Sequence, residues 1–144
     1  MNYTSQSTNT AIRPAGQHRD SVEQQPWDIR KRSVAYALRA IKLYRFLQAR
    51  KDGAGWILAK QYLRCATSIG ANIEEAQAGE SRSDFIHKLG IAQKEARESR
   101  YWLHLMGESG IVKMTKLKPL LAETEELVAV LTAIIVNSKS KSRG

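Results

Sequence analysis

The sequence predicts an all-α fold: an antiparallel, up-down-up-down four-helix bundle with a disordered N-terminal tail. Only 3 prolines and 9 glycines occur in 144 residues, and helix-forming Ala, Leu, Glu, Lys, Arg and Gln dominate after residue 26. Apolar residues recur at three-and-four spacing in four segments between residues 28 and 136. These segments have similar lengths and short connections, which favours antiparallel neighbours.

Two tails flank the predicted bundle. Residues 1–26 consist largely of small polar residues with almost no large apolar groups, so they cannot bury enough surface to offset the entropy of ordering. Residues 137–144 alternate Ser with Lys and Arg and have no apolar face. We therefore expect a flexible tail over 1–26, the bundle over 27–136 and a short basic tail over 137–144.

The first helix is expected from about Asp28 to Arg50, just after Pro26. Its predicted buried stripe is Val34, Ala37, Leu38, Ile41 and Tyr44. The glycines of the segment 52–55 break this helix, and the second is expected from about Trp56 to Gln77. Its inner face is predicted at Leu58, Tyr62, Cys65, Ile69, Ile73 and Ala76. Gly70 within it indicates close packing or a small bend.

Ser81 precedes Asp84 by three residues, which resembles a capping box and predicts the start of a third helix. Its seam is predicted at Phe85, Leu89, Ala92, Ala96, Ser99, Leu103 and Met106. Gly107 and Gly110 are expected to end it. The fourth helix is expected to begin near Lys116, so that Pro119 falls in its first turn.

Two of the helices carry a second apolar stripe, away from the predicted core. It comprises Tyr36, Leu43 and Phe46 on the first helix, and Ile91, Trp102 and Leu105 on the third. Scattered exposed apolar residues are ordinary, but two such stripes favour a subunit interface and a closed homo-oligomer.

Polar residues border the core of the second helix, at Gln61, Arg64, Ser68, Asn72 and Glu75, and Glu98 on the third helix is expected to reach Arg64 or Asn72. We interpret them as a structural stripe whose members hydrogen-bond one another and set helix register. A ligand or active site would need a nucleophile with a base, or clustered metal ligands, and the stripe supplies neither.

No other pattern indicates catalysis, a metal or a cofactor. His18, His87 and His104 are too far apart to form a metal site, and Glu95 with Glu98 lacks the Glu-x-x-His motif of di-iron bundles. The single cysteine, Cys65, is expected to be a buried and inert thiol. There is no phosphate-binding loop, nucleophile elbow or Cys-x-x-Cys motif. We therefore expect a protein that is not an enzyme.

The charge is the remaining signal. Lys and Arg number 23 against 14 Asp and Glu, a net charge of +9, and the first helix is especially basic. A solvated helix face is one explanation, and an anionic partner such as RNA or DNA is the other. Arg32, Arg39 and Arg50 share one sector of the first helix and are predicted to contact phosphates, with Lys139, Lys141 and Arg143 adding contacts from the tail. No aromatic platform interleaves with these residues, so little base readout is expected.

Residues 61–105 resemble the bacterial four-helix-bundle family whose founding members are encoded in intervening sequences of large-subunit ribosomal RNA genes. The resemblance is carried by Arg64, Ser68-Ile69, Ala71-Asn72-Ile73, Glu75, Ser83, Phe85, Leu89, Ile91-Ala92, Glu98 and Leu103. Gly70, and Ala76 after Glu74-Glu75, depart from the family pattern. The resemblance implies a cyclic homopentamer. Related accessory proteins of diversity-generating retroelements share the architecture and imply a reverse transcriptase as a possible partner.

Two functions are therefore expected, from different classes. The first is a non-catalytic, basic, pentameric module that binds nucleic acid as an accessory to ribosomal RNA or a reverse transcriptase. The alternative is a structural or protein-interaction scaffold without a direct nucleic-acid role. The longest uncharged runs are shorter than the roughly 18 apolar residues of a membrane span, so we expect a cytoplasmic protein with no membrane partner.

Overall fold

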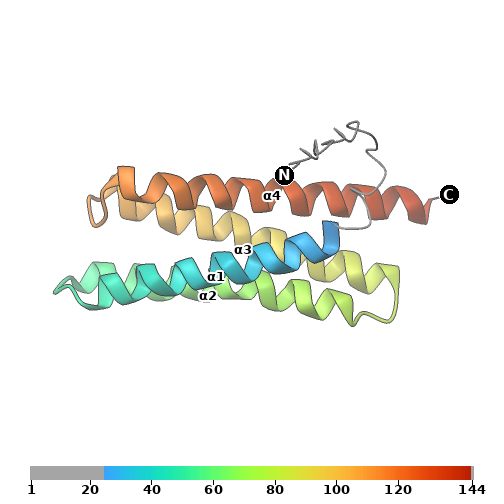
Figure 1. The fold of residues 1–144 in the computed structure, drawn as a ribbon, viewed down its shortest axis with the longest axis horizontal. Helices are drawn as coiled ribbons and strands as arrows, with labels where there is room; N and C mark the ends of the chain where they lie inside the picture. Colours follow the sequence, from blue (N-terminus) through green and yellow to red (C-terminus); the bar gives the residue numbers. More distant parts are fainter. Residues whose placement is uncertain (1–24, 144) are drawn as a thin grey trace, which may run out of the picture.

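The computed structural model describes residues 25–143, which form four α-helices packed side by side (Figure 1). They are α1 (Gln25–Gln48), α2 (Gly53–Gln77), α3 (Arg82–Glu108) and α4 (Met114–Ser142), and the described part of the chain contains no β-strand. The predicted all-α four-helix bundle is confirmed. Most of the predicted N-terminal tail lies outside the described residues, and its last two residues begin α1.

Each helix packs against two neighbours, in the cyclic order α1, α2, α3, α4. Consecutive helices run in opposite directions, so α1 and α4 are also antiparallel neighbours, while α1 and α3 lie on a diagonal of the bundle (Figure 1). The connections α1–α2 and α3–α4 therefore lie at the same end of the molecule. None of the described helices combines the length and the apolar character that a membrane crossing requires.

Local signals explain the helix ends. The Asp52 side chain accepts a hydrogen bond from the amide of Gly55 at 3.1 Å and caps α2. Ser81 accepts one from the amide of Asp84 at 3.1 Å and caps α3, as the sequence predicts. After α3 the chain turns at Gly110, whose φ of 76° is accessible to glycine at little cost.

The fourth helix is longer than expected at both ends, because it begins at Met114 and continues through Ser142. Residues 137–142 therefore extend α4 and do not form a separate tail. They contain neither Gly nor Pro, and lysine side chains in the last turn interact favourably with the negative end of the helix dipole.

The predicted inner faces of α2 and α3 are largely confirmed. Tyr62, Cys65, Ile69 and Ile73 of α2 are fully buried, and so are Leu89, Ala92, Ala96, Ser99, Leu103 and Met106 of α3. The core is completed by apolar residues of α4, including Leu117, Leu127 and Leu131.

The predicted faces of α1 are wrong. Val34 and Leu38, expected in the core, are 55% and 56% exposed, whereas Tyr36, expected at a subunit interface, is fully buried. The core side of α1 is Ile29, Ser33, Tyr36, Ala40 and Leu47.

The reason is that the helix has two apolar stripes of similar spacing, and only one fits the neighbouring helices. Ser33 faces Gly70, where an added Cβ would lie 3.2 Å from the serine Oγ, so small residues let α1 and α2 approach closely. The Tyr36 hydroxyl lies 2.7 Å from Oγ1 of Thr124 in α4, and Thr124 donates to the carbonyl of Leu120. These contacts select the stripe that contains Ser33 and Tyr36, and they explain Gly70 as a point of close packing.

Candidate nucleic-acid interface

Two of the three arginines predicted to contact phosphates lie on α1, and Arg50 lies just after it; all three face α4 or the connection before it, and each has a partner within the chain. Arg32 donates to Glu126 at 2.5 Å, and Arg39 pairs with Glu123. Arg50 donates to the carbonyl oxygen of Ile111 at 2.7 Å. They share one side of the helix, as their spacing predicts, but two of the three are paired with carboxylates.

The C-terminal candidates lie elsewhere. Lys139 and Lys141 are exposed in the last turns of α4, and Arg143 directly follows the helix. This end of the bundle is opposite the end where α1 terminates (Figure 1). The structure therefore does not bring the two predicted groups of cations together.

A stronger concentration of positive charge lies where the end of α1 meets the start of α4. The segments 42–52 and 108–118 come together at this end and contain seven basic residues against two acidic ones. Among the described residues, no carboxylate lies within ion-pair distance of Lys42, Lys113 or Lys116. This end therefore keeps charge that an anionic partner can use.

Phe46 lies at the centre of this region and is 43% exposed. The Lys116 Nζ is 5.1 Å from the centroid of its ring, and the Arg50 guanidinium carbon is 5.5 Å from it. Cation–π attraction thus holds one cation from the α1–α2 connection and one from α4 over the same aromatic ring.

Two adjoining hollows surround Phe46, with volumes of about 330 and about 310 Å³. They share Phe46, Val112 and Lys116. We call them together the Phe46 groove, whose complete lining is Arg39, Lys42, Leu43, Phe46, Arg50, Gly110, Ile111, Val112, Lys113, Lys116, Leu117 and Leu120. Its rim is cationic and its floor is apolar.

The expectation that no aromatic residue accompanies the basic residues is wrong at this groove. Phe46 lies between Lys42 and Arg50 in the sequence, but Lys113 and Lys116 join it only through the antiparallel packing of α1 and α4. The sequence could have indicated this groove, because a lysine cluster at the start of the fourth helix must lie near the end of an antiparallel first helix.

The polar stripe on α2 makes structural contacts. Arg64 donates to Glu98 at 2.8 Å, as expected, whereas Asn72 donates to the carbonyl of Ser68 at 2.8 Å and does not reach Glu98. Glu75 accepts from Lys88 of α3 at 2.6 Å. Gln61 is exposed. The stripe thus joins α2 to α3 by ion pairs rather than forming one continuous network.

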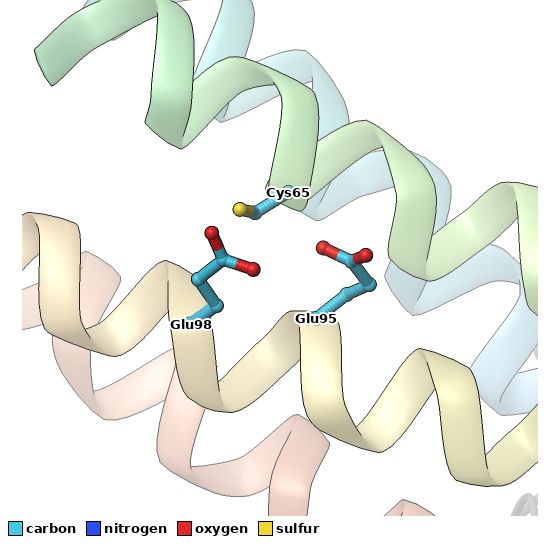
Figure 2. Close-up of side chains that lie close together, drawn as sticks. All are labelled: Cys65, Glu95 and Glu98. Carbon is cyan, nitrogen blue, oxygen red and sulfur yellow. The ribbon is translucent and has the colours of Figure 1, made fainter.

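Figure 2 shows the one group of possible metal ligands in the described part of the chain, Cys65, Glu95 and Glu98, whose ligand atoms lie within 4.8 Å of one another. Arg64 already supplies a cation to them. Its Nη2 lies 3.1 Å from the Cys65 Sγ, and its Nη1 lies 3.6 Å from Glu95 Oε2.

The pKa shifts in this group are consistent with Arg64 acting as its cation. Burial raises the pKa of the Cys65 thiol to about 12, so the thiol stays protonated at neutral pH beside Arg64. Burial alone would raise the pKa of Glu98, but hydrogen bonds from Cys65, Trp102 and Arg64 hold it below its ordinary value. The group is best described as an ion-pair cluster around Arg64.

The residues predicted at a subunit interface divide into three kinds. Tyr36 belongs to the core and Phe46 to the groove. Leu43, Ile91, Trp102 and Leu105 are half-buried. The apolar surface that the sequence missed is on α1, where Val34 and Leu38 line a shallow hollow of about 390 Å³. The spacing of apolar residues on this helix gave two equivalent stripes, and it did not indicate which of them faces the core.

Comparisons with known proteins agree with this architecture. A crystal structure of a protein with unknown function, from the S23 ribosomal protein family of Bacteroides thetaiotaomicron VPI-5482, is 37% identical to the chain, with a TM-score of 0.72. The similarity covers 77% of this chain and 97% of that one. No curated protein shows significant similarity. The model of the 23S rRNA-intervening sequence protein family matches residues 25–133, which is more than half of the sequence. The chain therefore belongs to the 23S rRNA-intervening sequence protein family.

Proposed function

We propose that this protein is a non-catalytic, cytoplasmic nucleic-acid-binding module that works as a homopentamer, as an accessory factor to ribosomal RNA or to a reverse transcriptase. The observation that carries the proposal is the unpaired positive charge around Phe46. Phosphates of RNA or DNA are the common anions that such a surface attracts, and release of their counterions drives binding.

Contacts within the chain change which residues carry this function. Arg39 is paired with Glu123 and Arg32 with Glu126, so their charges are largely compensated. Lys42, Lys113 and Lys116 have no such partner among the described residues and become the principal phosphate contacts. Lys139, Lys141 and Arg143 supply secondary contacts from the far end of the bundle.

The pentamer is supported by apolar patches on two diagonal helices. Val34 and Leu38 are exposed on α1, and Tyr101 is 55% exposed on α3 beside half-buried Trp102 and Leu105. Because the two patches differ and lie on diagonal helices, one can pack against the other on the next subunit. Such heterologous contacts form a ring when the rotation closes.

Fluorescence anisotropy with labelled RNA and DNA tests the proposed binding. Affinity should fall steeply between about 50 and 200 mM salt, with similar losses for unrelated sequences. A salt-independent affinity, or none, would contradict it. Light scattering should give five times the 16.2 kDa chain mass, and a monomer at micromolar concentration would contradict the ring.

A protein-interaction scaffold is the second candidate, and the exposed Val34 and Leu38 favour it, because the same patch can dock another protein. Val34→Ser with Leu38→Ser separates the two. If the patch joins subunits, the double variant dissociates to smaller species without any other protein present. If it stays fully assembled, the patch serves a different partner.

A further inference from the structure

The Phe46 groove has a feature that binding to phosphates alone does not require. A duplex presents its phosphates to cations on an accessible surface, while its bases stay stacked and paired inside. Here, exposed Phe46 and half-buried Leu43 line the same hollow as the cations Lys42 and Lys116, and the Lys116 ammonium lies over the Phe46 ring. This combination suits a ligand that is apolar and anionic at neighbouring positions.

We propose that the Phe46 groove binds an unpaired nucleotide of a single-stranded nucleic acid. Its base takes the place of a cation that lies over the Phe46 ring in the free protein, and the adjacent phosphates lie at the cations of α1 and α4. This inference rests on the proposed nucleic-acid function and names the ligand class at the same site. Base–aromatic stacking beside a basic track is a general way of holding single strands.

The size of the groove agrees with this ligand. Each hollow, about 330 and about 310 Å³, is at the lower end of the range of roughly 300–1,000 Å³ for small-molecule sites. That volume fits one base with part of its sugar and is far too small for a duplex. The floor beneath Phe46 is formed by buried core residues, so its position is set by the bundle.

The lining also indicates how selective the site is. Among the described residues, no Asp, Glu, Asn or Gln lines it, so it lacks the side chains that usually read the edges of adenine and cytosine. Its charged groups are lysines and arginines that suit phosphates. We therefore expect a preference for single strands over duplexes with little preference among sequences.

The test compares three variants of the full-length chain by anisotropy, using one single-stranded RNA oligonucleotide and the duplex that it forms with its complement. Phe46→Leu keeps an apolar side chain but removes the aromatic face, and Phe46→Trp keeps the face. Val136→Ala is the matched control, because Val136 is 59% exposed in the last part of α4, far from the groove.

We expect the unchanged protein to bind the single strand more tightly than the duplex. Phe46→Leu should weaken single-strand binding by about tenfold and leave duplex binding unchanged. Phe46→Trp and Val136→Ala should retain the unchanged affinity for both. Light scattering on each variant should give the same mass.

Four results would overturn the inference. If salt-dependent binding occurs but Phe46→Leu has no effect on it, the inference fails and the proposed function stands. If neither the RNA forms nor DNA of the same sequence binds, both fail. If Phe46→Leu changes the oligomer mass without changing affinity, the groove is a subunit contact. If polyglutamate displaces the single strand as effectively as unlabelled RNA does, the groove recognises acidic protein segments.

Discussion

The contact between α1 and α4 has two parts that differ in their basic residues. In the middle part the arginines are paired with carboxylates, and in the end part the cations surround Phe46. In the middle, Arg32 and Arg39 pair with Glu126 and Glu123 on either side of the buried hydrogen bond between Tyr36 and Thr124. At the end, Arg50 and Lys116 lie over the Phe46 ring, and no carboxylate from the described part of the chain lines the groove. The number of basic residues on a helix therefore overestimates the positive charge that is available to a partner, because carboxylates of a neighbouring helix can compensate part of it.

The largest expected effect separates the two parts by stability. Tyr36→Ala should lower the free energy of unfolding by about 3–5 kcal/mol, because it leaves a cavity in the core and removes the Tyr36–Thr124 hydrogen bond. Phe46→Ala should cost under about 1 kcal/mol, since its ring is partly solvated already. Urea denaturation at a fixed protein concentration measures both. Equal losses of stability in the two variants would show that Phe46 contributes to the fold as much as Tyr36 does.

The second prediction separates the two parts by nucleic-acid affinity. Replacing Lys42, Lys113 and Lys116 together by Gln should weaken RNA binding by about 100-fold near 0.1 M salt and flatten the salt slope by about 2–3. Replacing Arg32 and Arg39 by Gln should cost about threefold at most, because Glu126 and Glu123 already compensate them. Anisotropy across a salt series measures both. A larger effect from the arginine pair would reverse the assignment.

Alkali should destabilise the protein through buried phenol and thiol groups on α1 and α2. Burial raises the pKa of Tyr36 and of Tyr62, and it raises the pKa of Cys65 from 9.0 to about 12. A folded-state pKa above the unfolded value gives stability that is present below the unfolded pKa and is lost as pH rises toward the folded one. Stability should therefore begin to fall near pH 9 and should be lower by on the order of 1 kcal/mol at about pH 10.

Urea titrations at several pH values measure this loss. Cys65→Ala provides the control, because it should remove the part of the decline that begins near pH 9 and keep the part that tyrosine ionisation causes at higher pH. A stability that is constant or rises over this range would show that these groups ionise alike in the folded and unfolded chains.

The smallest expected effect comes from releasing one compensated cation. Glu123→Gln frees Arg39, which also lines the Phe46 groove, so RNA affinity should rise by about two- to threefold. Stability should change by less than about 1 kcal/mol, as for other partly exposed ion pairs. Arg39→Gln in the same background should abolish the gain, and a gain that persists without Arg39 would have another source.

The fold was predictable from sequence because its signals are local. Spacing along α2 and α3 identified their inner faces, and Ser81 with Asp84 marked a helix start that the structure confirms. Three-and-four spacing cannot choose between two stripes on one helix, and for α1 the choice depends on Gly70 and Thr124, which belong to other helices.

The candidate site was less predictable for the same physical reason. Glu123 and Glu126 are more than eighty residues from the arginines that they neutralise, and Lys116 is about seventy residues from Phe46 along the chain. Such pairs depend on which helices are neighbours and on how they are shifted along their axes. The Arg64–Glu98 pair was predictable because both residues lie at the edges of seams that the spacing had already placed together.

The helical extension of α4 through Ser142 has a consequence for the cations that it carries. Successive residues of an α-helix are rotated by about 100°, so Lys139 and Lys141 point about 200° apart. A disordered tail can gather its cations on a single phosphate strand, but this rigid extension directs them to opposite sides. The last turns of α4 therefore carry positive charge on opposite sides of the helix. This arrangement suits a position between two anionic strands better than contact along one strand.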